Sequence, residues 1–251
     1  MHERSKDLYL GEKLKENSQE KIVNMFDSIA PTYDRANRVL SLGIDIKWRK
    51  KACQLTFDYA NKKEISQIVD VACGTGDMMG HWDKIAKENH IHVKKIIGAD
   101  PSIQMMEVGR KKFPDFEFVK AKADELPFES ESTDIISISY GIRNVVQRQD
   151  ALDEFHRILK PKGYVLILEF TKSQKKGFLY TLRDFYLKNI LPIIGGIISK
   201  NKEAYDYLPN SIDGFLSTKK MQEELEEAGF KMLYVQDFSM DISTLFIAQK
   251  I

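Results

Sequence analysis

Two glycines separated by one threonine, Gly74 and Gly76, follow directly after the apolar run Ile68-Val69-Asp70-Val71. Glycine lacks a Cβ, so the backbone here can take positive φ and a ligand can approach the chain closely. The next stretch, residues 77–89, has the amphipathic pattern of a helix whose N-terminus faces the same gap. A strand, a glycine turn and a helix N-terminus in this order predict a cofactor site.

An acidic residue, Asp100, ends the next apolar run and lies 24 residues after Gly76. This spacing is close to the roughly 20 residues expected for a carboxylate that binds a ribose. A Gly-x-Gly turn alone is weak evidence, because many α/β proteins join a strand to a helix in this way. The turn and Asp100 together predict binding of a nucleoside.

Two common nucleotide sites are disfavoured. A dinucleotide site usually has a third glycine where this chain has Met79, and no second mononucleotide half is visible. The lysine of a phosphate-binding P-loop is also absent from the turn. A single adenosine-bearing ligand without a bulky phosphate group remains, and the spacing and the number of strands favour S-adenosylmethionine.

The elements that must position these residues alternate along the chain, which predicts a parallel, doubly wound sheet. Ligands of such sheets bind at the carboxyl ends of the strands. The chain closes with two runs that predict a hairpin. We therefore expect an α/β fold with a Rossmann-like, seven-stranded, mostly parallel sheet, helices on both faces and an antiparallel last strand. The expected strands are 65–72, 93–100, 116–121, 134–139, 164–170, 232–238 and 243–249.

Helical patterns precede and interrupt this alternation. We expect one structural unit with a helical N-terminal cap (residues 1–62), whose first 17 residues are polar and frayed, and an α/β domain (residues 63–251). Asp45 is expected to cap the third helix of the N-terminal part. The aromatic and aliphatic insert, residues 172–216, is too apolar for an idle linker and is expected to form helices over the ligand edge of the sheet.

The composition limits the function classes. The chain has 38 basic and 37 acidic residues, a net charge of +1, and this balance argues against nucleic acid as a partner. The basic run Lys47–Lys51 is interpreted as a solvated helix face. The two cysteines fit a reducing compartment, and the N-terminus has no signal-like apolar region, so we expect a cytoplasmic protein. The five histidines show no ligand spacing, so no metal is expected.

Several motifs resemble known families. The stretch Val69–Asp77 resembles motif I of class I S-adenosylmethionine-dependent methyltransferases, and Lys160-Pro-Lys-Gly163 resembles their fifth-strand signature. More narrowly, Met25–Asp34, Leu126-Pro-Phe128 and above all Ser139-Tyr-Gly-Ile-Arg-Asn-Val145 resemble the ubiquinone and menaquinone biosynthesis C-methyltransferases. These enzymes methylate a ring carbon of a polyprenylated benzoquinol or naphthoquinol, and the resemblance extends from about Val23 to the C-terminus.

The resemblance implies a set of cofactor-binding residues. Asp100 contacts the ribose hydroxyls, and Lys122 and Ala123 flank the adenine. The family usually has Asp or Asn where Lys122 stands, and a lysine cannot accept the hydrogen bond of the adenine amino group. Either the backbone or Asp124 is then the acceptor. The full expected set is Asp70, Gly74, Thr75, Gly76, Asp100, Lys122, Ala123 and Ser139, and the product is S-adenosylhomocysteine.

The chemistry that the resemblance implies needs few protein groups. A sulfonium methyl is already an electrophile, and a ring carbon becomes nucleophilic when the adjacent hydroxyl loses its proton, so positioning and a proton acceptor suffice. We expect Arg143 and Asn144 to orient the quinol oxygen or a water that acts as base, with Arg143 stabilising the phenolate. Arg143 could instead pair with a structural acid. Tyr33 either folds over the cofactor or packs as a hinge residue.

The expected function is therefore methylation of demethylmenaquinol, or of a benzoquinol, with a polyprenylated quinol as partner. The alternatives are a methyltransferase for another lipid or small molecule, and a cofactor-binding scaffold without turnover. Because such an acceptor is a membrane lipid, we expect peripheral contact of the insert with the inner face of the membrane. The sequence leaves the oligomeric state open.

Overall fold

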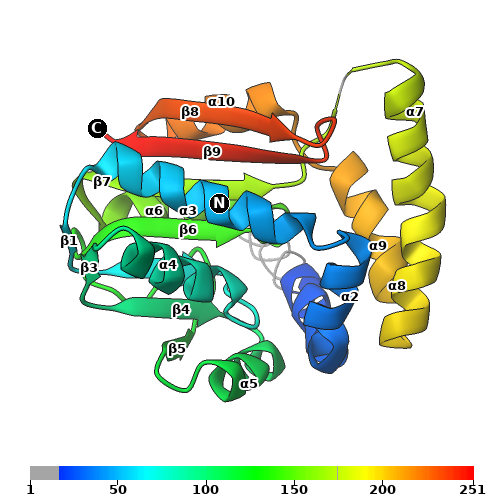
Figure 1. Ribbon diagram of the computed structural model, residues 1–251, viewed down its shortest axis with the longest axis horizontal. Coiled ribbons are helices and arrows are strands. Elements are labelled where there is room, and N and C mark those ends of the chain that lie inside the picture. Colours follow the sequence, from blue (N-terminus) through cyan, green and yellow to red (C-terminus); the bar gives the residue numbers. More distant parts are fainter. Residues whose placement is uncertain (1–16, 174) are drawn as a thin grey trace, which may run out of the picture.

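The computed structural model describes residues 17–173 and 175–251, and a seven-stranded sheet lies at its centre (Figure 1). Its strands are β2 (Ile68–Val71), β4 (Ile96–Asp100), β5 (Glu117–Lys120), β6 (Thr133–Ser139), β7 (Leu159–Glu169), β8 (Phe230–Phe238) and β9 (Ser243–Lys250). They lie in the order β5-β4-β2-β6-β7-β9-β8, and β9 is antiparallel to both of its neighbours. The predicted Rossmann-like sheet with an antiparallel last strand is confirmed.

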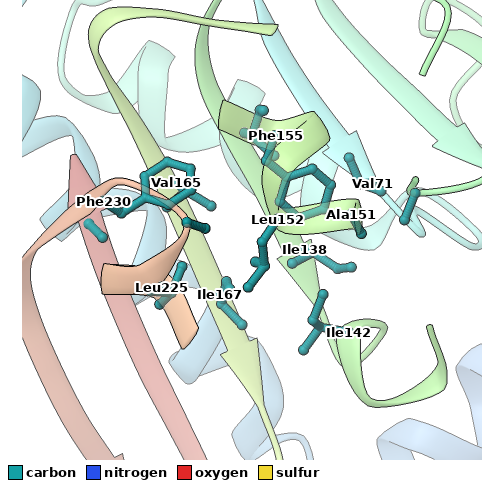
Figure 2. Packing of buried hydrophobic residues seen from close by; sticks show 14 of the residues in the cluster. Val71, Ile138, Ile142, Ala151, Leu152, Phe155, Val165, Ile167, Leu225 and Phe230 are labelled. Atoms are coloured by element: carbon teal, nitrogen blue, oxygen red, sulfur yellow. The ribbon is translucent and has the colours of Figure 1, made fainter. Parts of the chain in front are cut away.

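Helices cover both faces of the sheet. The helices that pack on the sheet are α3 (Ile44–Ala60), α4 (Asp77–Glu88), α5 (Ile103–Lys112), α6 (Arg148–Ile158) and α10 (Thr218–Glu227). Because neighbouring side chains of a strand point to opposite faces, Val69 and Val71 pack with α6 and α10, and Ile68 packs with α3 and α4. Figure 2 shows the first of these two cores, in which Phe155 of α6 and Leu225 of α10 meet the strands.

Two predicted strands are divided, and the first, expected over residues 65–72, forms β1 (Glu64–Ile65) and β2. The run expected over residues 93–100 forms β3 (His92–Val93) and β4, and β3 pairs with β1 (Glu64–Ile65) in a separate two-stranded sheet. Lys94 and Lys95 stand between the two pieces and are exposed. Two adjacent lysine side chains would be unfavourable in a buried central strand, so the strand pairing is interrupted at these residues.

The helical cap lies beside the carboxyl edge of the sheet. It consists of a helix over residues 17–29, η1 (Ala30–Thr32) and α2 (Tyr33–Leu40) at this edge, and of α3, which runs from the edge over one face of the sheet. The predicted cap role of Asp45 is wrong: α3 begins at Ile44 after Gly43, and Asp45 lies in its first turn, paired with Arg38 and Arg49. The frayed segment expected at the N-terminus lies outside the described residues, apart from residue 17, which is helical.

The insert before the last strands is helical, as predicted. Its elements are α7 (Phe178–Phe185), the π-helical turn η3 (Tyr186–Ile190), α8 (Leu191–Ser199) and α9 (Lys202–Asp213). The first three run as one long helix at the side of the molecule (Figure 1), and α8 packs against α9 and α2. The insert and the cap together close the space at the carboxyl edge of the sheet.

Candidate active site

A narrow cavity lies at the carboxyl ends of β2, β4 and β6. Gly74 has a φ of +54°, and a Cβ placed there would meet no atom within 4 Å, so a bound group could approach the backbone directly. The helix over residues 17–29 covers the cavity with Ile22, Val23 and Phe26, which leaves about 90 Å³ of free space. The cavity brings together most of the predicted site residues: Tyr33, Gly74, Asp100, Lys122, Ala123, Ser139 and Asn144.

Asp100 is held at this cavity by the backbone. Its carboxylate accepts hydrogen bonds from the N–H groups of Gly74 and Ser102, each at 2.8 Å. Burial raises the pKa of Asp100 to about 6, although both of these hydrogen bonds favour the ionised form. A fixed carboxylate beside the apolar Pro101 and Met105 fits a nucleoside, whose ribose donates hydroxyls and whose base needs an apolar slot.

The position of Lys122 agrees with either adenine acceptor that the sequence left open. The Lys122 side chain is exposed, whereas Ala123 is buried and Asp124 is half-buried. All three residues line the cavity. Asp124 therefore lies where a carboxylate could accept a hydrogen bond from a bound base.

Three of the predicted cofactor residues do not line the cavity. Asp70 is buried on the α3 and α4 face of β2, where it accepts a hydrogen bond from Ser137 Oγ at 2.6 Å. Thr75 donates its hydroxyl to Asp34 at 2.5 Å. Gly76 has a φ of +79°, which favours glycine, and a Cβ there would lie 3.1 Å from the Phe118 ring. These three residues stabilise the glycine turn and the strand before it without lining the cavity.

The burial of Asp70 predicts a pH-dependent stability. Burial raises its pKa to about 7, against 3.8 ordinarily, so between these values the folded protein keeps a proton that the unfolded chain has released. The free energy of unfolding therefore falls as the pH rises through this window. Asp70→Asn is expected to be more stable than the native protein at pH 8, on the order of 2 to 4 kcal/mol, and about equal to it at pH 4. Urea unfolding at both pH values measures this, and an Asn variant that is less stable at pH 8 would contradict it.

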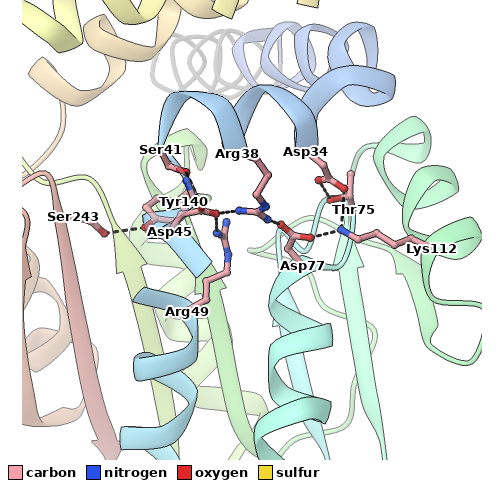
Figure 3. Close-up of polar contacts among 11 residues, drawn as sticks. Asp34, Arg38, Ser41, Asp45, Arg49, Thr75, Asp77, Lys112, Tyr140 and Ser243 are labelled. Carbon is pink, nitrogen blue, oxygen red and sulfur yellow. Dashed lines mark hydrogen bonds and ion pairs between the residues drawn. The ribbon is translucent and has the colours of Figure 1, made fainter. Parts of the chain in front are cut away.

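A network of ion pairs connects the cap with the start of α4, directly after the glycine turn (Figure 3). Arg38 of α2 bridges Asp45 of α3 and Asp77 at the start of α4. Lys112 at the end of α5 binds Asp77 and also Asp34 of α2, the latter at 2.8 Å. The charges of Lys112 and Arg38, among others, keep the pKa of Asp77 below its ordinary value, against the effect of burial. This network could not be predicted from the sequence, because its members are distant in the chain.

A second, larger cavity adjoins the first. It has a volume of about 560 Å³, within the range usual for pockets that bind small molecules, and its lining is mainly apolar and aromatic. The cap forms one side of it, and Tyr186, Leu191 and Leu208 of the insert form another. Phe26, Tyr33 and Tyr140 line both cavities, so the two spaces meet at these rings.

The predicted catalytic residues lie close to this junction. Arg143 lines the larger cavity and donates to Glu169 Oε1 at 2.5 Å and to the Tyr140 carbonyl at 2.9 Å. Asn144 lines the smaller cavity, and its Oδ1 accepts a hydrogen bond from Tyr207 at 3.0 Å. Glu169 is fully buried. Arg143 therefore pairs with a structural acid, which was one of the two interpretations of this arginine. The same guanidinium also faces the space in which a second ligand would lie.

Arg49 is a cavity residue that the sequence analysis missed. The interpretation of Lys47–Lys51 as a solvated face is wrong at this position, because Arg49 is 5% exposed and pairs with Asp45. Its guanidinium carbon lies 5.0 Å from the centre of the Tyr140 ring. The helical spacing from Arg49 to the buried Cys53, Thr56 and Ala60 would have placed Arg49 on the inner face of α3.

The fold is that of the S-adenosylmethionine-dependent methyltransferases. Solved structures support the fold. The chain superposes on an S-adenosylmethionine-dependent methyltransferase from Aquifex aeolicus with a TM-score of 0.54 and 18% identity, covering 75% of this chain and 84% of the other. A Thermotoga maritima protein described as an S-adenosylmethionine-dependent methyltransferase, possible histamine N-methyltransferase, gives a TM-score of 0.57 and 20% identity over 92% and 100% of the two chains.

The chain belongs to the ubiE/COQ5 methyltransferase family, which it matches over residues 13–250. It is 58% identical to the ubiquinone/menaquinone biosynthesis C-methyltransferase UbiE of Campylobacter jejuni over 93% of this chain and 99% of that relative. It is 38% identical to the demethylmenaquinone methyltransferase of Chlorobaculum tepidum over 93% of each chain. The family resemblance inferred from the motifs is confirmed, and with it the enzyme class and the cofactor, S-adenosylmethionine.

Proposed function

We propose that this enzyme transfers the methyl group of S-adenosylmethionine to a ring carbon of demethylmenaquinol. The names of its relatives support an acceptor of this kind. The structural observation that carries the proposal is the large apolar cavity, which joins the nucleoside cavity at Phe26, Tyr33 and Tyr140. A quinol ring in the larger cavity would thus lie next to the cofactor.

The cofactor would be held by the residues of the smaller cavity. Asp100 would accept hydrogen bonds from the ribose hydroxyls, and Gly74 would allow the close approach of the ligand. Lys122 and Ala123 would flank the adenine, with Asp124 as the acceptor for its amino group, and Ser139 would close the end of β6 beside it. Asp70, Thr75 and Gly76 would hold the turn in shape. When bound, S-adenosylmethionine supplies an electrophilic methyl group.

The acceptor would be activated at the junction of the cavities. Arg143 would stabilise the phenolate that forms when the hydroxyl next to the reacting carbon loses its proton. Asn144, fixed by Tyr207, would orient a water that accepts this proton. Tyr33 would lie between the two ligands, because it is half-buried and lines both cavities.

The test is methyl transfer from radiolabelled S-adenosylmethionine to short-chain demethylmenaquinol, with the matching benzoquinol in a parallel reaction. Label in the naphthoquinol supports the proposal, and label in both extends the acceptor class. The oxidised quinone serves as a control, because it has no hydroxyl proton to lose and should remain unlabelled. Label in neither quinol, with cofactor binding intact, would point to another lipid, another small molecule or a scaffold.

We also propose that the enzyme contacts the cytoplasmic face of the membrane, where its acceptor resides. Among the helices of the described ranges, none is long and apolar enough to cross a bilayer. Large apolar side chains are nevertheless exposed on the insert, with Phe178 82% and Ile197 73% exposed. Leu42, after α2, is 90% exposed and also lines the large cavity, which therefore reaches the surface. A prenyl tail could leave the cavity there.

The double substitution Phe178→Glu and Ile197→Glu is expected to reduce binding to anionic phospholipid vesicles at least about tenfold, because two apolar side chains would no longer enter the interface. Flotation of the protein with vesicles measures the bound fraction. Ile103→Glu, on an exposed site of α5, is the matched control and should leave binding unchanged. Equal flotation of the double variant and the native protein would exclude the insert as the contact.

A further inference from the structure

Two buried polar atoms, Arg49 Nε and the Tyr205 hydroxyl, have no hydrogen-bond partner within the described part of the chain. Both residues are almost fully buried, Arg49 with 5% and Tyr205 with 4% of its surface exposed. Leaving a buried donor unpaired is unfavourable, and most buried polar groups in proteins are paired. Two such groups in one site indicate that something outside the protein pairs with them.

Both residues line the larger cavity, and they come from different parts of the chain. Arg49 lies on α3 of the cap, and Tyr205 lies on α9 of the insert. The Tyr33 hydroxyl lies within electrostatic range of both, and it also lines this cavity. The unpaired groups therefore border the same cavity, which is the space proposed for the acceptor.

Each of the two side chains is held in place by its surroundings. Arg49 pairs with Asp45 through Nη1 and stacks over the ring of Tyr140, whose hydroxyl lies 3.1 Å from Ser243 Oγ. The Tyr205 ring lies directly against Gly195 of α8, where a Cβ would come within 2.1 Å of it. Only glycine leaves room for the ring at that position.

The chemistry of the two atoms limits the groups that can pair with them. Arg49 Nε can only donate a hydrogen bond, whereas a tyrosine hydroxyl can donate or accept one. A phenolic hydroxyl satisfies both, because it accepts from Arg49 and donates to Tyr205. Burial raises the pKa of Tyr205, so the side chain stays neutral and keeps its proton.

We propose that Arg49 and Tyr205 bind the acceptor hydroxyl that is remote from the reacting carbon. This assignment rests on the proposed function, in which Arg143 serves the hydroxyl next to that carbon. A hydroquinol carries its two oxygens at opposite ends of one ring, and the cavity offers two separate guanidinium groups, Arg49 from α3 and Arg143 from η2 (Ile142–Asn144). The ring would be held at both ends.

The experiment compares three reduced ligands with the same short prenyl tail: the naphthalenediol and the two mono-ols that each lack one hydroxyl. Calorimetric titration of the full chain, with S-adenosylhomocysteine present to prevent turnover, measures each dissociation constant. Tyr205→Phe should weaken binding of the diol about 3- to 10-fold. It should weaken the mono-ol that keeps the hydroxyl beside the tail-bearing carbon by the same factor, and leave the other mono-ol unchanged.

Arg49→Lys is the second variant, because it keeps the charge that pairs with Asp45 but has no donor at the Nε position. It should show the same dependence on the ligand, with a loss of roughly 10-fold or more. Thermal unfolding of Tyr205→Phe should not begin earlier than that of the native protein, since the missing hydroxyl has no partner within the described chain.

The outcomes separate this assignment from the proposed function. If native protein binds and methylates the diol, but Tyr205→Phe binds all three ligands as the native protein does, the assignment is wrong and the function stands. An equal loss for all three ligands would show that Tyr205 only shapes the cavity, and would also overturn it. If the native protein neither binds nor methylates the diol, both proposals fail together.

Discussion

Replacing Arg143 by methionine is expected to lower kcat for methyl transfer by roughly 10²- to 10³-fold, the loss usual for one donor that stabilises a developing oxyanion. Binding of S-adenosylmethionine should be retained, because Arg143 lines the acceptor cavity and not the cofactor cavity. The same change leaves Glu169 buried without its cation, which should cost roughly 3 to 5 kcal/mol of the free energy of unfolding. Turnover and urea unfolding are therefore measured together.

A second variant separates catalysis from stability. In the double variant Arg143→Met and Glu169→Gln, the buried position holds a neutral amide, so most of the lost stability should return while turnover stays low. Recovery of turnover together with stability would show that Arg143 is only structural. Arg148→Met is the matched control: it removes a partly buried ion pair with Glu224, 2.6 Å long, and neither residue lines a cavity. It should cost at most about 1 kcal/mol and leave turnover unchanged.

Replacing Asp100 by alanine is expected to raise the dissociation constant of S-adenosylmethionine roughly 10²-fold or more, because hydrogen bonds from two ribose hydroxyls to a carboxylate are worth about 1.5 to 3 kcal/mol each. The loss of the bonds from Gly74 and Ser102 would also loosen the turn. Calorimetric titration with the cofactor measures the change. Asp115→Asn, an exposed acid on the loop before β5, is the control and should bind as the native protein does. Unchanged cofactor affinity in Asp100→Ala would refute the ribose contact.

Cofactor affinity should also depend on pH through Asp100. Its pKa is about 6 in the free protein because the carboxyl is buried, and the ribose hydroxyls donate to the ionised form. Affinity is therefore highest above pH 6 and should fall up to about tenfold between pH 7 and pH 5. Asp100→Asn cannot titrate, so its weaker affinity should be flat over this range. The same slope in the Asn variant would assign the effect to another group.

The sheet could be predicted from the sequence because its signals are local. The apolar runs, the glycine turn and Asp100 at the end of a strand are all patterns within a few residues, and each reflects a backbone requirement. The residues that sequence reasoning misplaced depend on contacts between distant segments. Asp45 would cap α3 if α3 were alone, but Arg38 and Arg49 offer it two cations, and ion pairs in a buried site override the local preference.

The site residues that could not be placed from the sequence also depend on contacts between distant segments. Asp70 belongs to the glycine motif, yet the alternation of side chains along β2 directs it to Ser137, on the face opposite to Val69 and Val71. Arg49 looked like one member of a charged run, and only the cavity behind α3 gives it a different role from its neighbours. Neither fact can be obtained without the register of the strands and the orientation of the helix.

The helix over residues 17–29 contributes Phe26 to the walls of both cavities, and its Asp27 accepts a hydrogen bond from Ser102 at 2.6 Å, beside Asp100. Because the two cavities share this helix as a wall, a movement of the helix would change both of them. A movement of this helix that opens the cofactor cavity would also remove one wall of the acceptor cavity, because Phe26 belongs to both. We therefore expect the release of S-adenosylhomocysteine and the release of the methylated ring to be coupled.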